Sequence, residues 1–295
     1  MIIEPIRDVS QAVQLLLDGG LVVFPTETVY GLGGRVESDN AVEAIFAAKG
    51  RPSDNPLIVH VSSVAMARRY AEIGRVEKLL FETFAPGPLT LVCPVKSAVL
   101  SSRVNGGGTT VAVRIPDSEV ALELIRRVDC GLAAPSANRS GRPSPTDAEH
   151  ACVEMNGRVA AVLDGGPCRV GIESTVAYWD GERIIVLRPG AVTEEVLSET
   201  VRRVGKNATS FVGQAAAVSP GTKYRHYAPK VPVWLFTDAA ELPRSATGDL
   251  EAGIACVCSE EMAKLAAEKC FERDGSVSWV RDASDLQGSD PHANA

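Results

Sequence analysis

The chain has 295 residues, of which 45% are apolar and 23% are charged, and its formal net charge is −7. This length suits one large domain or two, and the apolar fraction allows a sizeable core. The acidic balance excludes a protein that coats nucleic acid with a uniformly basic surface, although a few cations can still focus positive potential in a cleft.

The cysteines and the N-terminal residues predict the cellular compartment of the protein. The seven cysteines match neither a zinc pattern nor a disulfide framework, and reduced thiols are typical of the cytoplasm. The first five residues lack the basic and apolar regions of a signal peptide, and no apolar run approaches the ~20 residues that span a bilayer. We therefore expect a cytoplasmic protein with no membrane partner.

Short apolar runs alternate with amphipathic stretches from the N-terminus to about residue 204. Helices are predicted at 9–17, 40–49, 64–72, 76–84, 118–128, 147–155 and 194–204. Strands are predicted at 21–24, 57–61, 89–93, 110–114, 131–134, 160–163, 174–179 and 183–187. The alternation is typical of an α/β fold with a mixed sheet and flanking helices.

Two local patterns predict connections. Asp180-Gly181 between two strands is a strong hairpin turn. Thr146 followed three residues later by Glu149 is a capping box, and it predicts the start of the helix at 147–155.

The composition changes near residue 206. Residues 206–222 are rich in Ala, Gly, Ser and Val without a clear period, which predicts a linker. Strands at 231–236, 253–258 and 277–280, with a helix at 260–271, then predict a small α/β domain. Residues 289–295 carry no packing pattern, and we expect them to be disordered.

The segment from Lys49 to His60 places two cations between a helix and an apolar strand, in a loop that two prolines constrain. Lys49 and Arg51 can neutralise phosphates, the guanidinium with two hydrogen bonds; the alternative is a solvated pair favoured by the helix C-terminus. Asn55 either binds a ligand or forms an Asx-turn. His60 is either a ligand contact or a satisfied core residue.

Two further groups of polar residues lie at strand ends. Arg114 finishes a buried strand and needs a carboxylate or phosphate, either from a ligand or from within the protein. Thr110 lies four residues earlier on the same strand face. Ser136, Asn138 and Ser144 crowd a turn after the strand at 131–134, where α/β proteins commonly bind ligands; turn chemistry alone is the alternative.

Standard nucleotide motifs are missing. The chain has no G-x-x-x-x-G-K-[ST], and the glycines at 106–108 lack the dinucleotide-binding spacing. Ser136 lies outside any G-x-S-x-G elbow, so we do not interpret it as a nucleophile.

Taken in order, six segments resemble the threonylcarbamoyl-AMP synthase family, which is built on a YrdC-type domain. They are residues 24–32 (FPTETVYGL), 48–52 (AKGRP), 55–60 (NPLIVH), 134–141 (APSANRSG), 173–175 (EST) and 188–190 (RPG). Residues 219–229 (SPGTKYRHYAP) are similar to the linker of the family's two-domain branch.

The resemblance implies a domain organisation. A YrdC-type catalytic domain with a twisted mixed sheet would span 1–205, and a linker at 206–230 would fold over the active site. A small Rossmann-like α/β domain would span 231–288. It looks short, and after about residue 285 it departs from the family's usual ending.

The resemblance also implies a reaction. L-threonine, bicarbonate or CO2, and ATP would give threonylcarbamoyl-AMP and pyrophosphate, with Mg²⁺ held through the nucleotide. A carbamate formed on the threonine amine would attack the α-phosphorus. A downstream transferase complex would use the product to modify ANN-reading tRNAs, so that tRNA is only an indirect partner.

Each motif residue receives a role by the same resemblance. The catalytic group would be Lys49, Arg51, Ser136 and Asn138. The ATP contacts would be Arg51, Asn55, Thr110, Ser136, Ser144, Arg188 and Tyr227. The L-threonine contacts would be Thr28, His60, Arg114, the Ala134 backbone and Ser174. No residue is assigned to a metal.

Other interpretations stay open. An RNA-binding module would use Lys49, Arg51, Arg139, Arg142 and Arg188 as a concave basic face, although no aromatic stacking residues separate these cations. A carbamoyl-transfer maturation factor for hydrogenases carries a related domain, but such chains have zinc-type cysteine pairs that this sequence lacks. The sequence determines neither the oligomeric state nor whether Lys49 acts on phosphate or on the carbamate.

Overall fold

A computed structural model describes residues 3–96, 100–203, 211–212, 254–257 and 277–280. The chain divides into two compact units, Met1–Ala228 and Pro229–Ala295. In the second unit, β11 (Ile254–Val257) and β12 (Val277–Val280) pair in parallel at two positions where the sequence predicts strands. The predicted strand at 231–236, the helix at 260–271 and the tail at 289–295 lie outside the described residues.

The first unit is built on a mixed sheet of ten strands in the order β10-β9-β8-β4-β5-β3-β6-β2-β1-β7. Their bounds are β1 (Val22–Phe24), β2 (Gly31–Arg35), β3 (Ile58–His60), β4 (Leu89–Pro94), β5 (Thr110–Arg114), β6 (Leu132–Ala133), β7 (Ala161–Val162), β8 (Thr175–Trp179), β9 (Ile184–Arg188) and β10 (Phe211–Val212). Parallel pairs such as β3/β5 and β4/β8 adjoin antiparallel pairs such as β4/β5, which confirms the mixed α/β class.

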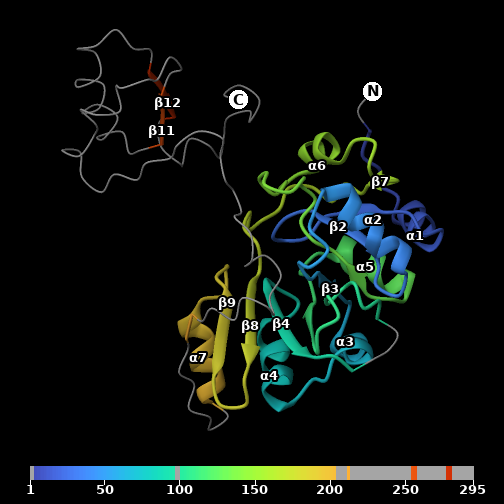
Figure 1. The fold of residues 1–295 in the computed structure, drawn as a ribbon. Coiled ribbons are helices and arrows are strands. Elements are labelled where there is room, and N and C mark those ends of the chain that lie inside the picture. The colour runs from blue at the N-terminus through green and yellow to red at the C-terminus, as the bar shows by residue number, and fades with distance from the viewer. Residues whose placement is uncertain (1–2, 97–99, 204–210, 213–253, 258–276, 281–295) are drawn as a thin grey trace. The chain divides into compact units, whose positions relative to one another are not determined.

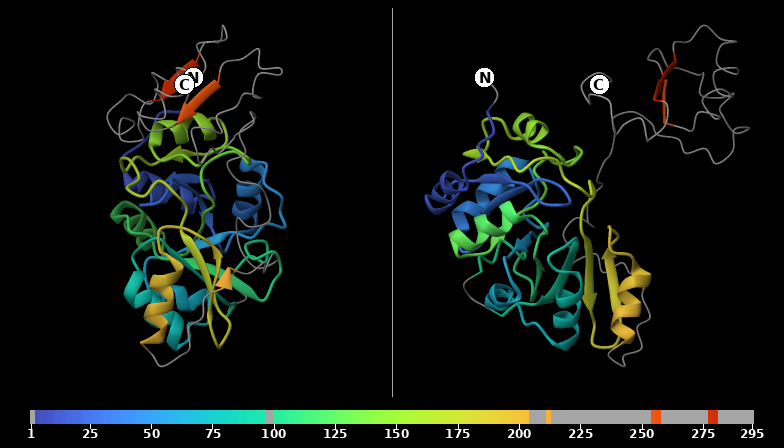
Figure 2. Two further views of the ribbon diagram at one scale, coloured as in Figure 1. Left: turned by 90° about the vertical axis from the view of Figure 1, so that its left-hand side faces the viewer. Right: turned by 180° about the vertical axis from the view of Figure 1, so that it is seen from behind.

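Seven helices of the described residues flank this sheet. They are α1 (Val9–Leu17), α2 (Asp39–Lys49), α3 (Val64–Tyr70), α4 (Arg75–Phe84), α5 (Glu119–Val128), α6 (Ala148–Met155) and α7 (Glu194–Arg202). Helices α1, α2 and α5 gather beside β1 and β2, whereas α4 and α7 gather beside β4, β8 and β9 (Figures 1 and 2). Among the described helices, none is long and apolar enough to cross a bilayer.

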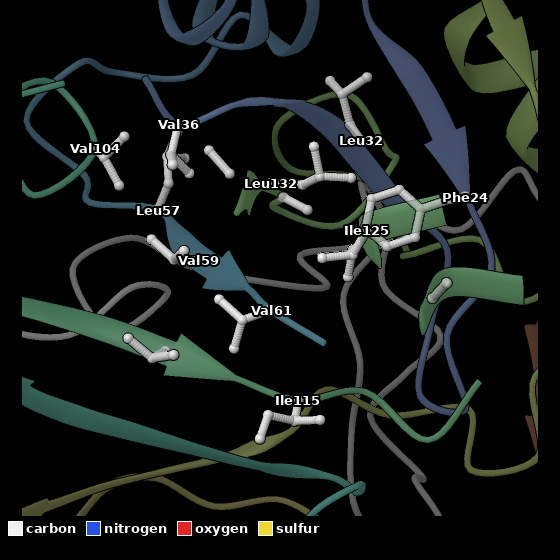
Figure 3. Close-up of a cluster of buried hydrophobic side chains, with 14 of the residues drawn as sticks. Phe24, Leu32, Val36, Leu57, Val59, Val61, Val104, Ile115, Ile125 and Leu132 are labelled. Atoms are coloured by element: carbon white, nitrogen blue, oxygen red, sulfur yellow. The ribbon is translucent and has the colours of Figure 1, made fainter. Parts of the chain in front are cut away.

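Buried apolar side chains of the core surround β3, which lies near the middle of the strand order. Figure 3 shows Val59 of β3 and the adjacent Val61 among side chains from β1, β2, β6 and α5. Phe24 and Leu32 are fully buried in this cluster. Burying side chains of this size stabilises the fold by roughly 1.5–3 kcal/mol each. The core therefore anchors β3, whose last residue faces the site described below.

Helix α2 positions the first cation of the site. Ser38 caps its N-terminus, with the Oγ atom accepting a hydrogen bond from Ala41 N at 3.2 Å. Gly50 ends it in the left-handed conformation at φ 60°, which a residue with a Cβ adopts only with strain. The chain turns sharply here, so Lys49 stays on the helix while Arg51 enters the loop.

The hairpin predicted at Asp180-Gly181 is confirmed between antiparallel β8 and β9. Asp180 Oδ1 accepts hydrogen bonds from the backbone N–H groups of Glu182 at 2.8 Å and Arg183 at 2.7 Å. Gly181 has φ 100°, which explains the glycine at this position. The turn directs β9 back along β8 and so brings Arg188 beside the start of β8.

Two predictions about local structure are wrong. The sequence predicts no strand at β2, where three of the first four residues are glycines, yet Gly33 is required: a Cβ there would lie 2.7 Å from the Phe24 ring. The cap of α6 is Asp147 rather than Thr146, with Asp147 Oδ1 accepting from His150 N at 2.8 Å. The Asp147 carboxylate, one residue nearer the helix, is therefore the N-cap that we expected Thr146 to be.

Gly190 gives a test of the packing between β8 and β9. A Cβ at this position would lie 2.3 Å from Thr175 N and 2.6 Å from Glu173 O. We expect Gly190→Ala to lower the free energy of unfolding by about 1–3 kcal/mol, because rigid backbone must move. Denaturant unfolding measures the loss.

The control is Gly108→Ala, on an exposed loop, where a Cβ would lie 3.2 Å from Asn105 O. It should change stability by only about 0.5 kcal/mol. Equal effects of the two substitutions would contradict the close approach at Gly190.

Candidate functional site

One pocket gathers eight of the predicted site residues. Its volume is about 550 Å³, including the solvent space at its mouth. It opens between the loop that follows β1, the ends of β3, β5 and β9, and the start of β8. The predicted residues in its wall are Thr28, Arg51, His60, Arg114, Ala134, Ser136, Ser174 and Arg188.

The other predicted residues divide into four groups. Lys49, Asn138 and Ser144 lie directly behind the wall, where hydrogen bonds join them to Ser136 and Glu173. Asn55 is buried in the proline-bound loop, and its N–H donates to Pro52 O at 3.2 Å. Thr110 begins β5, whereas Arg114 ends it, which separates them by roughly 13 Å. Tyr227 lies outside the described residues.

A buried ion pair supports one wall of the pocket, which Arg114 lines and behind which Glu27 lies. Arg114 Nη2 lies 2.7 Å from Glu27 Oε1, and both side chains are almost fully buried. The pair has the distance of a strong contact but poor hydrogen-bond angles, since neither atom has a well-aligned partner in the described structure. Glu27 Oε2 accepts from Asp117 N at 3.0 Å, and Arg114 Nε donates to Gly87 O at 3.4 Å. The internal carboxylate that Arg114 was expected to need is therefore Glu27.

His60 sits beside Arg114 because β3 and β5 pair in parallel with these two residues in register. Its ring packs edge-on to Phe24, with 5.9 Å between the ring centroids. Burial, together with the nearby Arg114 charge, lowers the pKa of His60 to about 3. The imidazole is thus neutral at physiological pH, and it can offer a lone pair to a ligand.

Ser174 and Arg188 also line the pocket. Arg188 donates from Nη2 to the Ser174 carbonyl at 2.9 Å and to Ser174 Oγ at 3.2 Å. Ser174 is buried at the start of β8, and Arg188 ends β9. The hairpin described above therefore places a cation and a hydroxyl at one point of the wall.

Lys49 is buried rather than solvated. Its Nζ atom donates to the Ser136 carbonyl and, at 2.5 Å, to the Asn138 carbonyl. Asn138 Oδ1 in turn accepts from Ser136 Oγ at 2.6 Å. Burial, followed by the charge of Arg51, lowers the pKa of Lys49 to about 7. Lys49 therefore holds the Ser136–Asn138 turn, and the alternative of a solvated pair does not apply to it.

Arg51 lies in the wall and also stabilises its own loop. It donates from Nε to Asn55 O at 3.2 Å and from Nη2 to Pro56 O at 2.9 Å. The guanidinium also lines the pocket, where its charge can meet an anion.

Two acidic residues of the site are missing from the sequence-based prediction. Glu27 pairs with Arg114, and Glu173 accepts from Ser144 Oγ at 2.6 Å. Both lie in polar segments at strand ends, where local pattern favours ordinary loop residues. A buried arginine in the strand at 110–114 was the signal that an internal acid was needed.

Removing the Glu27 charge should reveal its role. Glu27→Gln keeps the shape but leaves Arg114 without its counter-charge, so we expect a loss of about 3–5 kcal/mol in the free energy of unfolding. Denaturant unfolding measures this loss. In the double variant Glu27→Gln/Arg114→Met most of the loss should be recovered; additive losses would contradict a direct coupling.

Lys49 should make stability depend on pH. Its folded pKa of about 7 lies below the ordinary value of 10.5, so between these pH values the unfolded chain binds more protons than the folded one. Stability should therefore rise as pH increases through this window. Unfolding of wild type and Lys49→Met between pH 6 and pH 10 measures the difference. If the unfolding free energies of the two proteins changed with pH in parallel, burial would not disfavour the charged form of Lys49.

Comparisons with known proteins identify the family of this chain. A family model described as "Telomere recombination", for Sua5, YciO and YrdC proteins, matches residues 14–190. A second, described as "Threonylcarbamoyl-AMP synthase, C-terminal domain", matches residues 192–289.

Curated relatives and a solved structure give the same result. The chain is 44% identical over 226 residues to a threonylcarbamoyl-AMP synthase of Bacillus subtilis and 45% identical over 225 residues to that of Pyrococcus abyssi. These matches cover 76% and 75% of this chain but 65% and 66% of the relatives, so the chain spans about two thirds of their length. The crystal structure of P. abyssi Sua5 complexed with L-threonine is 34% identical, with a TM-score of 0.75 over 96% of this chain and 84% of that one. This chain therefore belongs to the threonylcarbamoyl-AMP synthase family, in the branch that carries the family's C-terminal domain.

Proposed function

We propose that this protein forms threonylcarbamoyl-AMP and pyrophosphate from L-threonine, bicarbonate or CO2, and ATP. The observation that carries the proposal is the composition of the one pocket described above. Arg114, His60 and Ser174 line it from the ends of β5 and β3 and the start of β8, and Arg51 and Ser136 line it from the two polar loops. Its wall thus offers cations, a neutral imidazole and hydroxyls, which suit a ligand with both amino-acid and phosphate groups.

The amino-acid side would bind L-threonine. Arg114 would offer its guanidinium to the carboxylate, although Glu27 already shares that charge. Neutral His60 would accept a hydrogen bond from the amine or the hydroxyl of the substrate. Thr28 and the Ala134 backbone lie in the same wall. A site that pairs the substrate hydroxyl would reject valine, because a buried polar group would lose its partner.

The nucleotide side would neutralise the phosphates of ATP with Arg51 and hydrogen-bond them through Ser136. Lys49 would contribute by holding the Ser136–Asn138 turn, since its donors already reach two carbonyl oxygens there. The described residues hold no group of three or more His, Cys, Asp or Glu side chains that could ligate a metal. Mg²⁺ would therefore be held mainly through the nucleotide and water.

Such a site works by positioning and charge neutralisation. A carbamate is unstable in water, and a partly enclosed pocket protects it. Its oxygen would attack the α-phosphorus, and pyrophosphate would leave, with no covalent enzyme intermediate. Five further residues remain predicted ATP contacts: Asn55, Thr110, Ser144, Arg188 and Tyr227.

An RNA-binding module is less well supported by the cations named for it. Lys49 is buried, and Arg139 and Arg142 both pair with Glu154, at 3.5 and 2.9 Å. A basic face made of these side chains would lack Lys49 and would be weakened by Glu154 beside two of its arginines. We propose instead that tRNA is reached only indirectly, through a downstream transferase that consumes the product.

Mass spectrometry of a brief incubation with ATP, Mg²⁺, bicarbonate and L-threonine tests the reaction. We expect a threonylcarbamoyl-AMP signal that requires threonine. Arg51→Ala should reduce it at least tenfold, because a charged hydrogen bond of about 1.5–3 kcal/mol is lost.

The matched control is Arg203→Ala, whose side chain is exposed beside the end of α7 and pairs with Glu199 at 3.0 Å; it should leave the signal unchanged. Absence of the adduct from folded, ATP-binding protein would refute the synthase proposal. Salt-dependent tRNA binding without ATP would then favour the RNA-binding module.

A further inference from the structure

A buried threonine lies behind Ser174 and has no role in the site as described so far. Thr90 of β4 is fully buried, and its Oγ1 atom lies 2.7 Å from Ser174 Oγ. β4 and β5 pair with Thr90 opposite Arg114. Thr90 therefore adjoins two predicted substrate contacts without itself lining the pocket.

Counting hydrogen-bond partners favours one direction for the bond between the two hydroxyls. Each hydroxyl has one proton and two lone pairs. If Ser174 donated to Thr90, the Thr90 proton would have no acceptor, because the described structure places no other partner near Thr90 Oγ1. Orphaned buried donors are rare. The favoured arrangement is therefore Thr90 donating to Ser174.

This direction determines what Ser174 presents to the pocket. Arg188 Nη2 can only donate, and it lies 3.2 Å from Ser174 Oγ. With Thr90 and Arg188 both donating, the lone pairs of Ser174 are occupied, and its own proton is left for the pocket. A ligand atom at this point must then be an acceptor, and the two neighbouring arginines favour an anionic oxygen.

We propose that Thr90 is a positioning residue that fixes Ser174 as a hydrogen-bond donor to the carboxylate of the amino-acid substrate. This inference rests on the proposed function. Among the groups of L-threonine, the ammonium can only donate and the hydroxyl can do either, so the carboxylate is the group that matches a fixed donor beside cations.

Thr90→Val removes the hydroxyl and keeps the branched shape. Ser174 then has a free lone pair, and its proton is no longer directed into the pocket. We expect the affinity for L-threonine to fall roughly fivefold, as for the loss of one hydrogen bond, and Thr90→Ser to restore it. Thr200→Val is the matched control, since Thr200 is also buried and donates to Val196 O at 2.8 Å on α7.

Calorimetry in the presence of a non-hydrolysable ATP analogue measures the binding of L-threonine and of L-threoninol, in which an alcohol replaces the carboxylate. Thr90→Val should weaken L-threonine binding about fivefold and L-threoninol binding less than about twofold. Equal weakening of both ligands, or of neither, would overturn the role of Thr90. A purely structural role would lower the unfolding temperature without this discrimination.

Two further outcomes are separable. If the wild-type protein binds no L-threonine, the proposed function fails, and this inference fails with it. If the wild-type protein binds L-threonine and makes the adduct but Thr90→Val behaves in the same way, only this inference fails. Should Thr90→Val not fold, Ser174→Ala tests the same donor. Its effect should again be confined to L-threonine, and equal losses for both ligands would overturn the assignment.

Discussion

The buried pair of Glu27 and Arg114 is the interaction on which the site depends. Two charges removed from water are costly, and they are tolerated only when they compensate each other and find further partners. Here the pair joins the loop after β1 to the end of β5, and Asp117 N and Gly87 O supply the further contacts. Because His60 and Thr90 are in register with Arg114 on the two neighbouring strands, fixing Arg114 fixes this wall of the pocket.

The same principle governs the other side of the pocket. Lys49 is buried, and it satisfies its donors on the backbone of the turn at Ser136 and Asn138 instead of on solvent. Arg51, two residues on, donates to its own loop and also lines the pocket. Two cations that look alike in sequence therefore have different roles, because Lys49 shapes the site whereas Arg51 is placed to meet a ligand.

Much of the fold could be predicted from local pattern. α1 and α5 have strong apolar faces, and the hairpin at Asp180-Gly181 depends on a turn that few residues can make. The prediction failed where tertiary contacts reverse a local preference. β2 is rich in glycine, a poor strand former, because Phe24 packs against it with no room for side chains. In α6, two neighbouring residues could cap the helix, and local pattern alone does not choose between them.

By itself, the sequence determined which residue types are available at the strand ends and in the two polar loops, because strand periodicity, prolines and glycines act over a few residues. Local pattern thereby marked Arg51, His60, Arg114 and Ser136 as candidates. The family resemblance added the other four predicted residues of the pocket wall, Thr28, Ala134, Ser174 and Arg188. Only the tertiary structure decided the partners: Glu27 for Arg114, the turn carbonyls for Lys49, and Thr90 for Ser174. These contacts join residues that are far apart in the chain and that the tertiary fold brings together. Thr90 and Ser174 are 84 positions apart, and Lys49 and Asn138 are 89 positions apart. Burial makes the loss of any of these contacts costly in free energy, because a polar group away from water must find its partner within the protein.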